Sequence, residues 1–176
     1  GGAINGADKC VAIGKSALDA AITQDGTIAI GHDALTALTS GNENIAIGFQ
    51  AGLAQTTGDG NTVIGYDAFK SADGAEGSNV VIGKTAGQSM NHDSSNQNVI
   101  VGVGAMSGGT AQQDQNVAVG YFALGSIGNN AHTGSVAVGS NALGALTSAA
   151  GNTAVGYGAL KTATTAPKMT AVGYEA

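Results

Sequence analysis

A short motif recurs along the whole chain of 176 residues: three mostly apolar residues, a glycine, two variable residues and an alanine. A representative copy is Asn44–Ala51, with the sequence NIAIGFQA. Ten copies are present, and their glycines are 17 to 19 residues apart. A period this short is typical of solenoids, in which each repeat packs mainly on its neighbours. The ten glycines are Gly14, Gly31, Gly48, Gly65, Gly83, Gly102, Gly120, Gly139, Gly156 and Gly173.

The residues around each glycine predict the local structure of one repeat. A β-branched run that ends at a glycine indicates a buried strand followed by a turn. Glycine is needed where the chain adopts φ > 0 or where backbones approach closely. An alanine follows three residues after the glycine in all ten copies, which indicates a nearby wall. We therefore expect two short strands joined at the glycine, followed by a polar loop.

These features predict an all-β protein with a single repeat domain over residues 1–176. The fold is expected to be a parallel β-roll, or solenoid, of about ten coils with a 17 to 19 residue repeat. At roughly 4.8 Å per level, ten coils would form a rod about 45–50 Å long. The chain opens on Gly1-Gly2 and ends within a motif, so we expect it to be a piece of a longer protein.

Both faces of the predicted strands are apolar. The three positions before the glycine are all apolar in seven of the ten copies, with Thr62, Thr153 and Thr170 as the exceptions. A strand with one face in water alternates, so we expect both faces to be covered. Because aromatic residues make up only 4% and tryptophan is absent, one coil has a thin core, and we expect a homotrimer, intertwined or side by side. The residues directly before the glycines would lie in the trimer core or the roll core: Ile13, Ile30, Ile47, Ile64, Ile82, Val101, Val119, Val138, Val155 and Val172.

Composition excludes several classes of function. The net charge is −6 and the six basic residues are all lysine, which argues against nucleic acid as a partner. No apolar run reaches the roughly 18 residues of a membrane span, so no membrane insertion is expected. Cys10 is the single cysteine and forms no disulfide framework. The three histidines lie in separate repeats without metal-ligand spacing, and we expect no cofactor and no enzymatic activity.

Two features are candidates for contact with a partner. The longest loops, residues 88–97 and 125–134, are expected to project outward. Aromatic residues recur directly after the glycine, where they would either stack on sugar rings or cover a seam between subunits. The asparagine that opens six copies is instead expected to form a structural ladder. The candidate receptor-contacting residues are Tyr66, Tyr121, Tyr157, Asn91, His92, Asp93, Asn129, Asn130 and His132.

Two other solenoid classes fit the sequence less well. Hexapeptide-repeat acyltransferases need an aliphatic residue six places after the Ile or Val, and only Leu53 of nine readable copies supplies one. Ice-binding solenoids present a column of threonine, whereas threonine occurs three places before the glycine in only three copies.

The repeats NTAVGYGALKTATTAPKMTAVGYEA and NIAIGFQAGLAQTTGDGNTVIGYDAF resemble those of bacteriophage tail-fibre proteins. The N-x-V-A-I-G core is also similar to the head repeats of trimeric autotransporter adhesins, although those repeats are shorter. This resemblance covers essentially the whole chain and implies a homotrimeric β-roll from a longer fibre protein. It further implies an extracellular place, on a virion tail fibre or a bacterial cell surface, and attachment to a cell-surface receptor, possibly a glycan.

The alternative under this resemblance is a pure stalk or spacer whose receptor-binding tip lies elsewhere. Some copies depart from the pattern, and we expect these departures to loosen the coils locally. Gly52 and Gly87 stand where other copies carry leucine. The opening asparagine is replaced in four copies by Cys10, Thr27, Ser135 and Met169.

Overall fold

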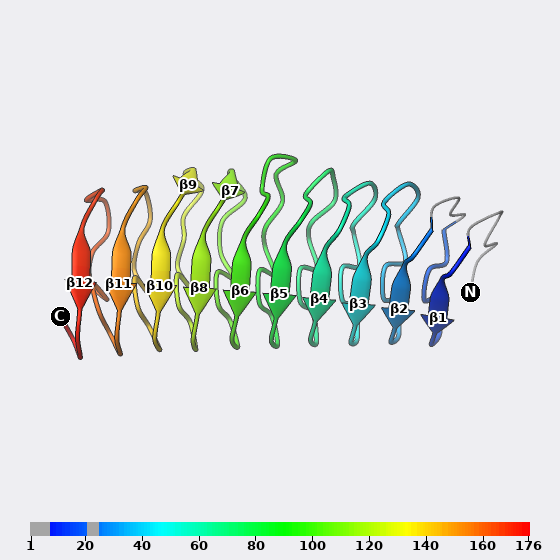
Figure 1. The fold of residues 1–176 in the computed structure, drawn as a ribbon, viewed down its shortest axis with the longest axis horizontal. Coiled ribbons are helices and arrows are strands. Elements are labelled where there is room, and N and C mark those ends of the chain that lie inside the picture. The colour runs from blue at the N-terminus through cyan, green and yellow to red at the C-terminus, as the bar shows by residue number, and fades with distance from the viewer. Residues whose placement is uncertain (1–7, 21–24) are drawn as a thin grey trace.

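The computed structural model describes residues 8–20 and 25–176, and this part of the chain is an all-β parallel solenoid without a helix. Ten of its strands form one parallel sheet, and the chain makes about nine turns between them. Figure 1 shows the coils side by side along a rod. The strands of this sheet are β1 (Val11–Ile13), β2 (Ile28–Ile30), β3 (Ile45–Ile47), β4 (Thr62–Ile64), β5 (Val80–Ile82), β6 (Val99–Val101), β8 (Val117–Val119), β10 (Val136–Val138), β11 (Thr153–Val155) and β12 (Thr170–Val172).

Each strand pairs in register with the equivalent strand of the next repeat. Ala29 of β2 pairs with Ala46 of β3, and the same residue positions pair throughout the sheet. Two further short strands, β7 (Gln113–Asp114) and β9 (His132–Thr133), lie in the loops and pair with each other. The prediction of an all-β parallel solenoid is therefore confirmed.

Within each strand the middle residue points into the coil and its two neighbours point outward. The middle residues from Ala29 to Ala154 are buried, whereas the flanking residues of the same strands are half-buried or exposed. The roll core is completed by the alanine column, from Ala17 to Ala159, and by large side chains such as Leu35 that follow it. The interior alanine confirms the predicted close wall.

The motif glycine is required for both reasons that the sequence suggested. Gly48 has φ +140°, in the region that side chains disfavour. A Cβ on Gly48 would also collide with the carbonyl oxygen of Gly65 in the next coil. The same geometry recurs from Gly14 to Gly156, so the coils can stack at one strand spacing only where this column lacks side chains.

The predicted second strand after the glycine is wrong, because this segment is a turn within each described coil. The residues two and four places after the glycine adopt left-handed φ values, for example +57° at Asp33 and +49° at Leu35. Left-handed residues reverse the direction of the chain and cannot continue a strand. This turn sends the leucine column into the core, where Leu35 has no exposed surface.

Gly52 and Gly87 do not leave gaps in the leucine column. Both have left-handed φ values, +59° and +56°, which glycine adopts without strain. A Cβ on Gly52 would come within 2.9 Å of Leu35 Cδ2, so the preceding leucine already fills this space. At Gly87 the nearest atoms belong to Met90, Ile100 and Phe69. The expected local loosening is thus offset by neighbouring side chains.

The predicted asparagine ladder is confirmed. The Oδ1 atom of Asn79 accepts hydrogen bonds from the backbone N–H of Asn98 at 3.0 Å and from Asn98 Nδ2 at 2.9 Å. Asn98 Nδ2 also donates to the carbonyl of Gln113 at 2.7 Å. Equivalent bonds connect the buried ladder residues from Asn44 to Asn116, and Ser135 interrupts the ladder before Asn152. The ladder satisfies backbone groups that three-residue strands leave unpaired.

Candidate functional site

The outer face of the ten-stranded sheet is apolar along its whole length apart from three threonines. Two columns of side chains form it, one at the first and one at the third position of each strand. Ile13 at one end is 57% exposed and Val172 at the other is 71% exposed, and the members between them are half-buried by their neighbours along the sheet or, in the case of Val99, exposed. The sequence predicts that the residues directly before the glycines lie either in the roll core or in the trimer core. The structure places them outside the roll, so they do not belong to the roll core. We call these two columns the outer strand face.

The aromatic column runs beside this face and stacks on itself. His32, Phe49 and Tyr66 form a continuous stack, with ring centroids 5.3 and 5.0 Å apart. The Lys84 ammonium group lies 5.8 Å from the centroid of the Tyr66 ring. Tyr66 therefore has a neighbour on both sides of its ring. Sugar stacking needs a free ring face, so the prediction that Tyr66 binds a sugar loses its physical basis.

The other two predicted tyrosines differ from Tyr66. Tyr157 stacks on Tyr174 at 5.1 Å, but its neighbour in the preceding coil is Ser140. Tyr121 is 55% exposed, and its ring partner among the described residues is Phe122, in an edge-to-face contact at 4.7 Å. These two rings retain faces that no ring of the described residues stacks on.

The predicted loop residues lie at the surface, but on separate levels. His92 and Asp93 are exposed and belong to the loop between β5 and β6, which protrudes furthest in Figure 1. Asn91 is half-buried, and its Nδ2 donates to Asp73 Oδ2 at 3.4 Å. Asn129 and Asn130, in the loop before β9, are exposed.

The side-chain hydrogen bonds of Asp93, Asn129 and Asn130 run to neighbouring coils and not to each other. Asn129 accepts a bond from Thr110 Oγ1 at 3.2 Å, and Asn130 Nδ2 donates to the Thr147 carbonyl at 3.2 Å. Asp93 Oδ1 accepts a long bond from the backbone N–H of Ala75, at 3.4 Å. The structure thus gathers no common site from these residues.

The prediction that His132 contacts a receptor is wrong, because this residue is completely buried. Its Nδ1 lies 3.0 Å from the carbonyl oxygen of Ala149, and its Nε2 lies 3.2 Å from that of Thr147. In five preceding coils the carbonyl equivalent to Ala149 accepts a bond from a ladder asparagine instead, as His132 O does from Asn116 Nδ2 at 3.0 Å. At this level the ladder residue is Ser135, which is too short to reach. A neutral imidazole donates from one nitrogen only, and in the tautomer with the proton on Nδ1 His132 supplies the donor that the serine lacks.

Burial shifts the pKa of two side chains, His132 and Glu76. Burial lowers the pKa of the His132 imidazole, although the contacts with the Thr147 and Ala149 carbonyls act in the opposite direction. Burial also raises the pKa of the Glu76 carboxyl group, whose Oε2 accepts a hydrogen bond from the Gly74 N–H at 2.9 Å. Both groups fill interior positions of long coils, and neither reaches a solvent-exposed reactive site.

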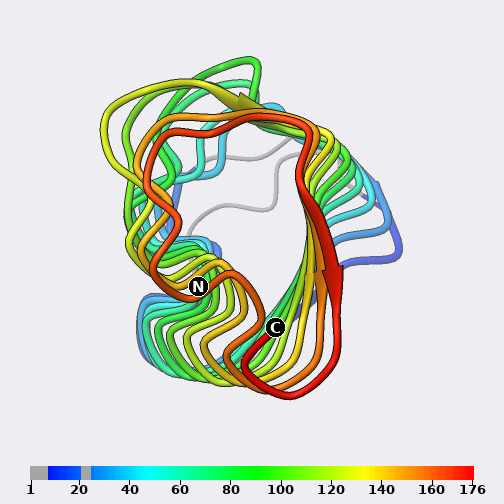
Figure 2. The same ribbon diagram turned by 90° about the vertical axis from the view of Figure 1, so that its left-hand side faces the viewer.

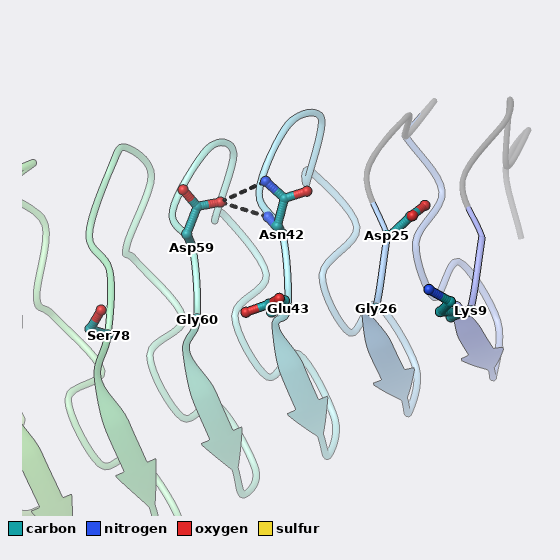
Figure 3. A pocket seen from close by; sticks show the side chains of 8 residues that line it. All are labelled: Lys9, Asp25, Gly26, Asn42, Glu43, Asp59, Gly60 and Ser78. Carbon is teal, nitrogen blue, oxygen red and sulfur yellow. Dashed lines mark hydrogen bonds between the residues drawn. The ribbon is translucent and has the colours of Figure 1, made fainter.

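A shallow hollow that the sequence did not indicate lies beside the first coils (Figure 3). Asn42 donates from its backbone N–H and its Nδ2 to Asp59 Oδ1, at 2.7 and 3.3 Å. These bonds link the turns of consecutive coils and resemble the ladder in the interior. Within the described residues, no group of three or more His, Cys, Asp or Glu side chains is arranged to hold a metal ion. The residues around the hollow are Lys9, Asp25, Gly26, Asn42, Glu43, Asp59, Gly60 and Ser78.

Comparison with known proteins adds no identity to this geometry. No protein-family model matches the chain, and no curated protein or solved structure is significantly similar to it. The described part of the chain also contains no helix that could cross a membrane. The class that the fold defines is a parallel β-solenoid with an uncovered apolar sheet face.

Proposed function

We propose that this chain is a structural and adhesive segment of a homotrimeric fibre. The observation that carries the proposal is the outer strand face, which runs without a charged residue along all ten strands of the sheet. Parallel sheets are normally covered on both faces, because their strands are apolar on both sides. Extended apolar surfaces on soluble proteins usually mark contacts with other molecules.

The size of the outer strand face suits contact between subunits. Two outward positions on each of ten strands give 10 × 2 = 20 side chains. A standard stable interface uses about 20–30 residues on each side. The columns consist of Val and Ile apart from three threonines, and β-branched side chains lose little rotamer freedom when a partner covers them.

A second copy of this chain is the occupant that matches the repeat best. Its own outer strand face has the same spacing between levels, so parallel copies can align coil against coil. Three copies around a common axis would cover the face of each chain and place the loops at the surface of the rod. The resemblance to tail-fibre and adhesin-head repeats supports the same number of chains and an extracellular place, on a virion or a bacterial surface.

In this proposal the trimer acts by attachment to a cell surface, through a glycan or protein receptor, and catalyses no reaction. Three equivalent contact sites on one rod raise the effective concentration of each contact, so individual sites need little affinity. The other function that fits the same face is a spacer, in which the trimer forms equally well but makes no contact with a receptor.

Substitution of Ile47 by Asp tests the assembly. Ile47 is half-buried on the outer strand face, so Ile47→Asp should leave the coil folded and prevent association. A buried carboxylate in an apolar interface is strongly unfavourable. Light scattering should give about three times 16.9 kDa for the native chain and about one times that mass for the variant.

Two controls with the same change in charge define the outcome. Thr57 is exposed and uses its backbone N–H to bond Gly74 O, so Thr57→Asp should leave the trimer intact. Ala46 faces the interior, so Ala46→Asp should unfold the chain. A native chain that is monomeric, or an Ile47→Asp variant that remains trimeric, would contradict the proposed assembly.

A further inference from the structure

The aromatic column has a regular spacing from coil to coil. The three stacked pairs have centroid separations between 5.0 and 5.3 Å and interplanar angles between 11° and 20°. Each separation corresponds to one level of the solenoid. Rings on consecutive levels therefore stack without any adjustment of the backbone.

Ser140 interrupts this column between two tyrosines. Tyr121 occupies the preceding level and Tyr157 the following one. Ser140 is half-buried, and its Oγ accepts a hydrogen bond from Asn141 Nδ2 at 3.2 Å. Its side chain is far smaller than a ring, so the level between the two tyrosines lacks one aromatic group.

Phe122 does not fill this level. Its ring lies over Gly104 in the preceding coil, where a Cβ would be 2.9 Å from Phe122 Cζ. Phe122 therefore leans away from Ser140. Tyr174 covers the side of Tyr157 that faces away from Ser140. In the described part of the chain, no ring stacks on either tyrosine from the Ser140 level.

The missing rung is one level of the column, between the levels of Tyr121 and Tyr157. Two levels of the solenoid separate Tyr121 from Tyr157, which is about 10 Å at the strand spacing of the sheet. A ring above Ser140 would then lie about 5 Å from each tyrosine, inside the usual range for ring contacts. This is also the separation that the native stacked pairs adopt.

We propose that the Ser140 level binds one neutral pyranose ring between Tyr121 and Tyr157. A pyranose presents apolar C–H groups to the tyrosine faces, while its hydroxyl groups stay in water or bond to the Ser140 hydroxyl and the Asn141 amide. The net charge of −6 disfavours anionic sugars. This site rests on the adhesive function proposed above and assigns the sugar contact to one level of the rod.

Tyrosine fluorescence can report binding, because the chain has four tyrosines and no tryptophan. We would titrate the native protein with the methyl pyranosides of glucose, galactose and N-acetylglucosamine, and separately with indole. Binding of at least one glycoside is expected at millimolar concentration, as for a single weak contact. Binding of indole without binding of any glycoside would show that the rung takes a planar ring and would overturn the sugar assignment.

Ser140→Phe should occupy the rung with the chain's own ring and lower glycoside affinity at least about tenfold. Val103→Phe is the matched control, since it adds the same ring on the other side of Tyr121 and should change affinity less than about twofold. Equal affinity in Ser140→Phe and the native protein would refute the site, as would the absence of glycoside binding to the native protein.

Light scattering on the same samples separates this inference from the assembly. A trimer that binds no glycoside would refute the Ser140 site and leave the fibre assembly in place. A monomer that binds glycoside, with loss of binding in Ser140→Phe, would support the site and refute the assembly.

Discussion

Ser135 stands in the buried ladder where other repeats carry asparagine. We therefore expect the stability of this coil to depend on His132. His132→Ala removes the donor to Ala149 O and leaves a cavity where the imidazole was. An unpaired buried carbonyl costs about 1–3 kcal/mol, and truncation of a large buried side chain to alanine costs about 2–5 kcal/mol. Because the two contributions overlap, we expect a loss of about 3–5 kcal/mol in the free energy of unfolding.

Restoration of the ladder should recover part of this loss. In Ser135→Asn, the new Nδ2 can donate to Ala149 O as other ladder residues do to the equivalent carbonyl. The new Oδ1 can accept from Asn152 Nδ2, which has no partner in the structure. Ser135→Asn should therefore add about 1 kcal/mol in the native background and about 2–3 kcal/mol in the His132→Ala background. The difference is a coupling of about 1–2 kcal/mol.

Urea denaturation of the four proteins of this double-mutant cycle measures the coupling, provided that the slope of unfolding free energy against urea stays constant. Since solenoids can unfold in segments, exchange of the Asn152 amide, which donates to Ser135 Oγ at 3.3 Å, gives a local measurement. Ser135→Asn combined with Leu38→Ala, a buried change in a distant coil, is the additive control. Additive effects of His132→Ala and Ser135→Asn, within about 0.5 kcal/mol, would refute the proposed compensation.

Two further predictions concern the glycine column and the buried carboxyl group. Gly48→Ala should prevent stacking or cost more than about 4 kcal/mol, whereas Gly134→Ala, with φ +66° and no atom within 4 Å of the new Cβ, should cost about 1–2 kcal/mol; thermal unfolding compares them. Burial raises the folded-state pKa of Glu76 above its unfolded value of 4.5, so the folded state binds more protons and stability falls as the pH rises through the raised pKa. Glu76→Gln should remove this fall, and an unchanged pH dependence would contradict the assignment.

The sequence predicted the features that every level repeats. The glycine, alanine and asparagine columns each impose one residue type at one place, and the structure gives each a role that recurs from coil to coil. The direction of the strand side chains could not be predicted in the same way. All three strand positions are apolar, so no alternation distinguished the interior Ala46 from the exterior Ile47.

The errors arose where the physical constraint lies outside the motif. The sequence predicts a strand after the glycine, whereas Leu35 there has a left-handed φ, which leucine seldom adopts. His132 was assigned to the surface because it lies in a loop rich in Gly and Asn. The available signal was Ser135, three residues later, where the buried ladder loses an amide and needs another donor.

The length of each coil is linked to the residue three places before the ladder position. In four of the five coils of 17 residues this residue is small: Gly41, Gly58, Ala149 or Ala166; the fifth coil carries Gln24, which lies outside the described residues. A Cβ on Gly41 or Gly58 would collide with a carbonyl oxygen of the next coil. The four coils of 18 or 19 residues instead carry Glu76, Ser95, Gln113 and His132, all completely buried.

Figure 2 shows that the loops of these longer coils, coloured green and yellow, extend beyond the others at one corner of the cross-section. Added residues widen the coil at that corner, and an interior side chain must then fill the extra space. Polar side chains suit it because loop carbonyls, such as those of Thr147 and Ala149 around His132, face the same space. Insertions in this solenoid are therefore not free surface loops, since three of the four longer coils bury a large side chain, Glu76, Gln113 or His132, at the same position.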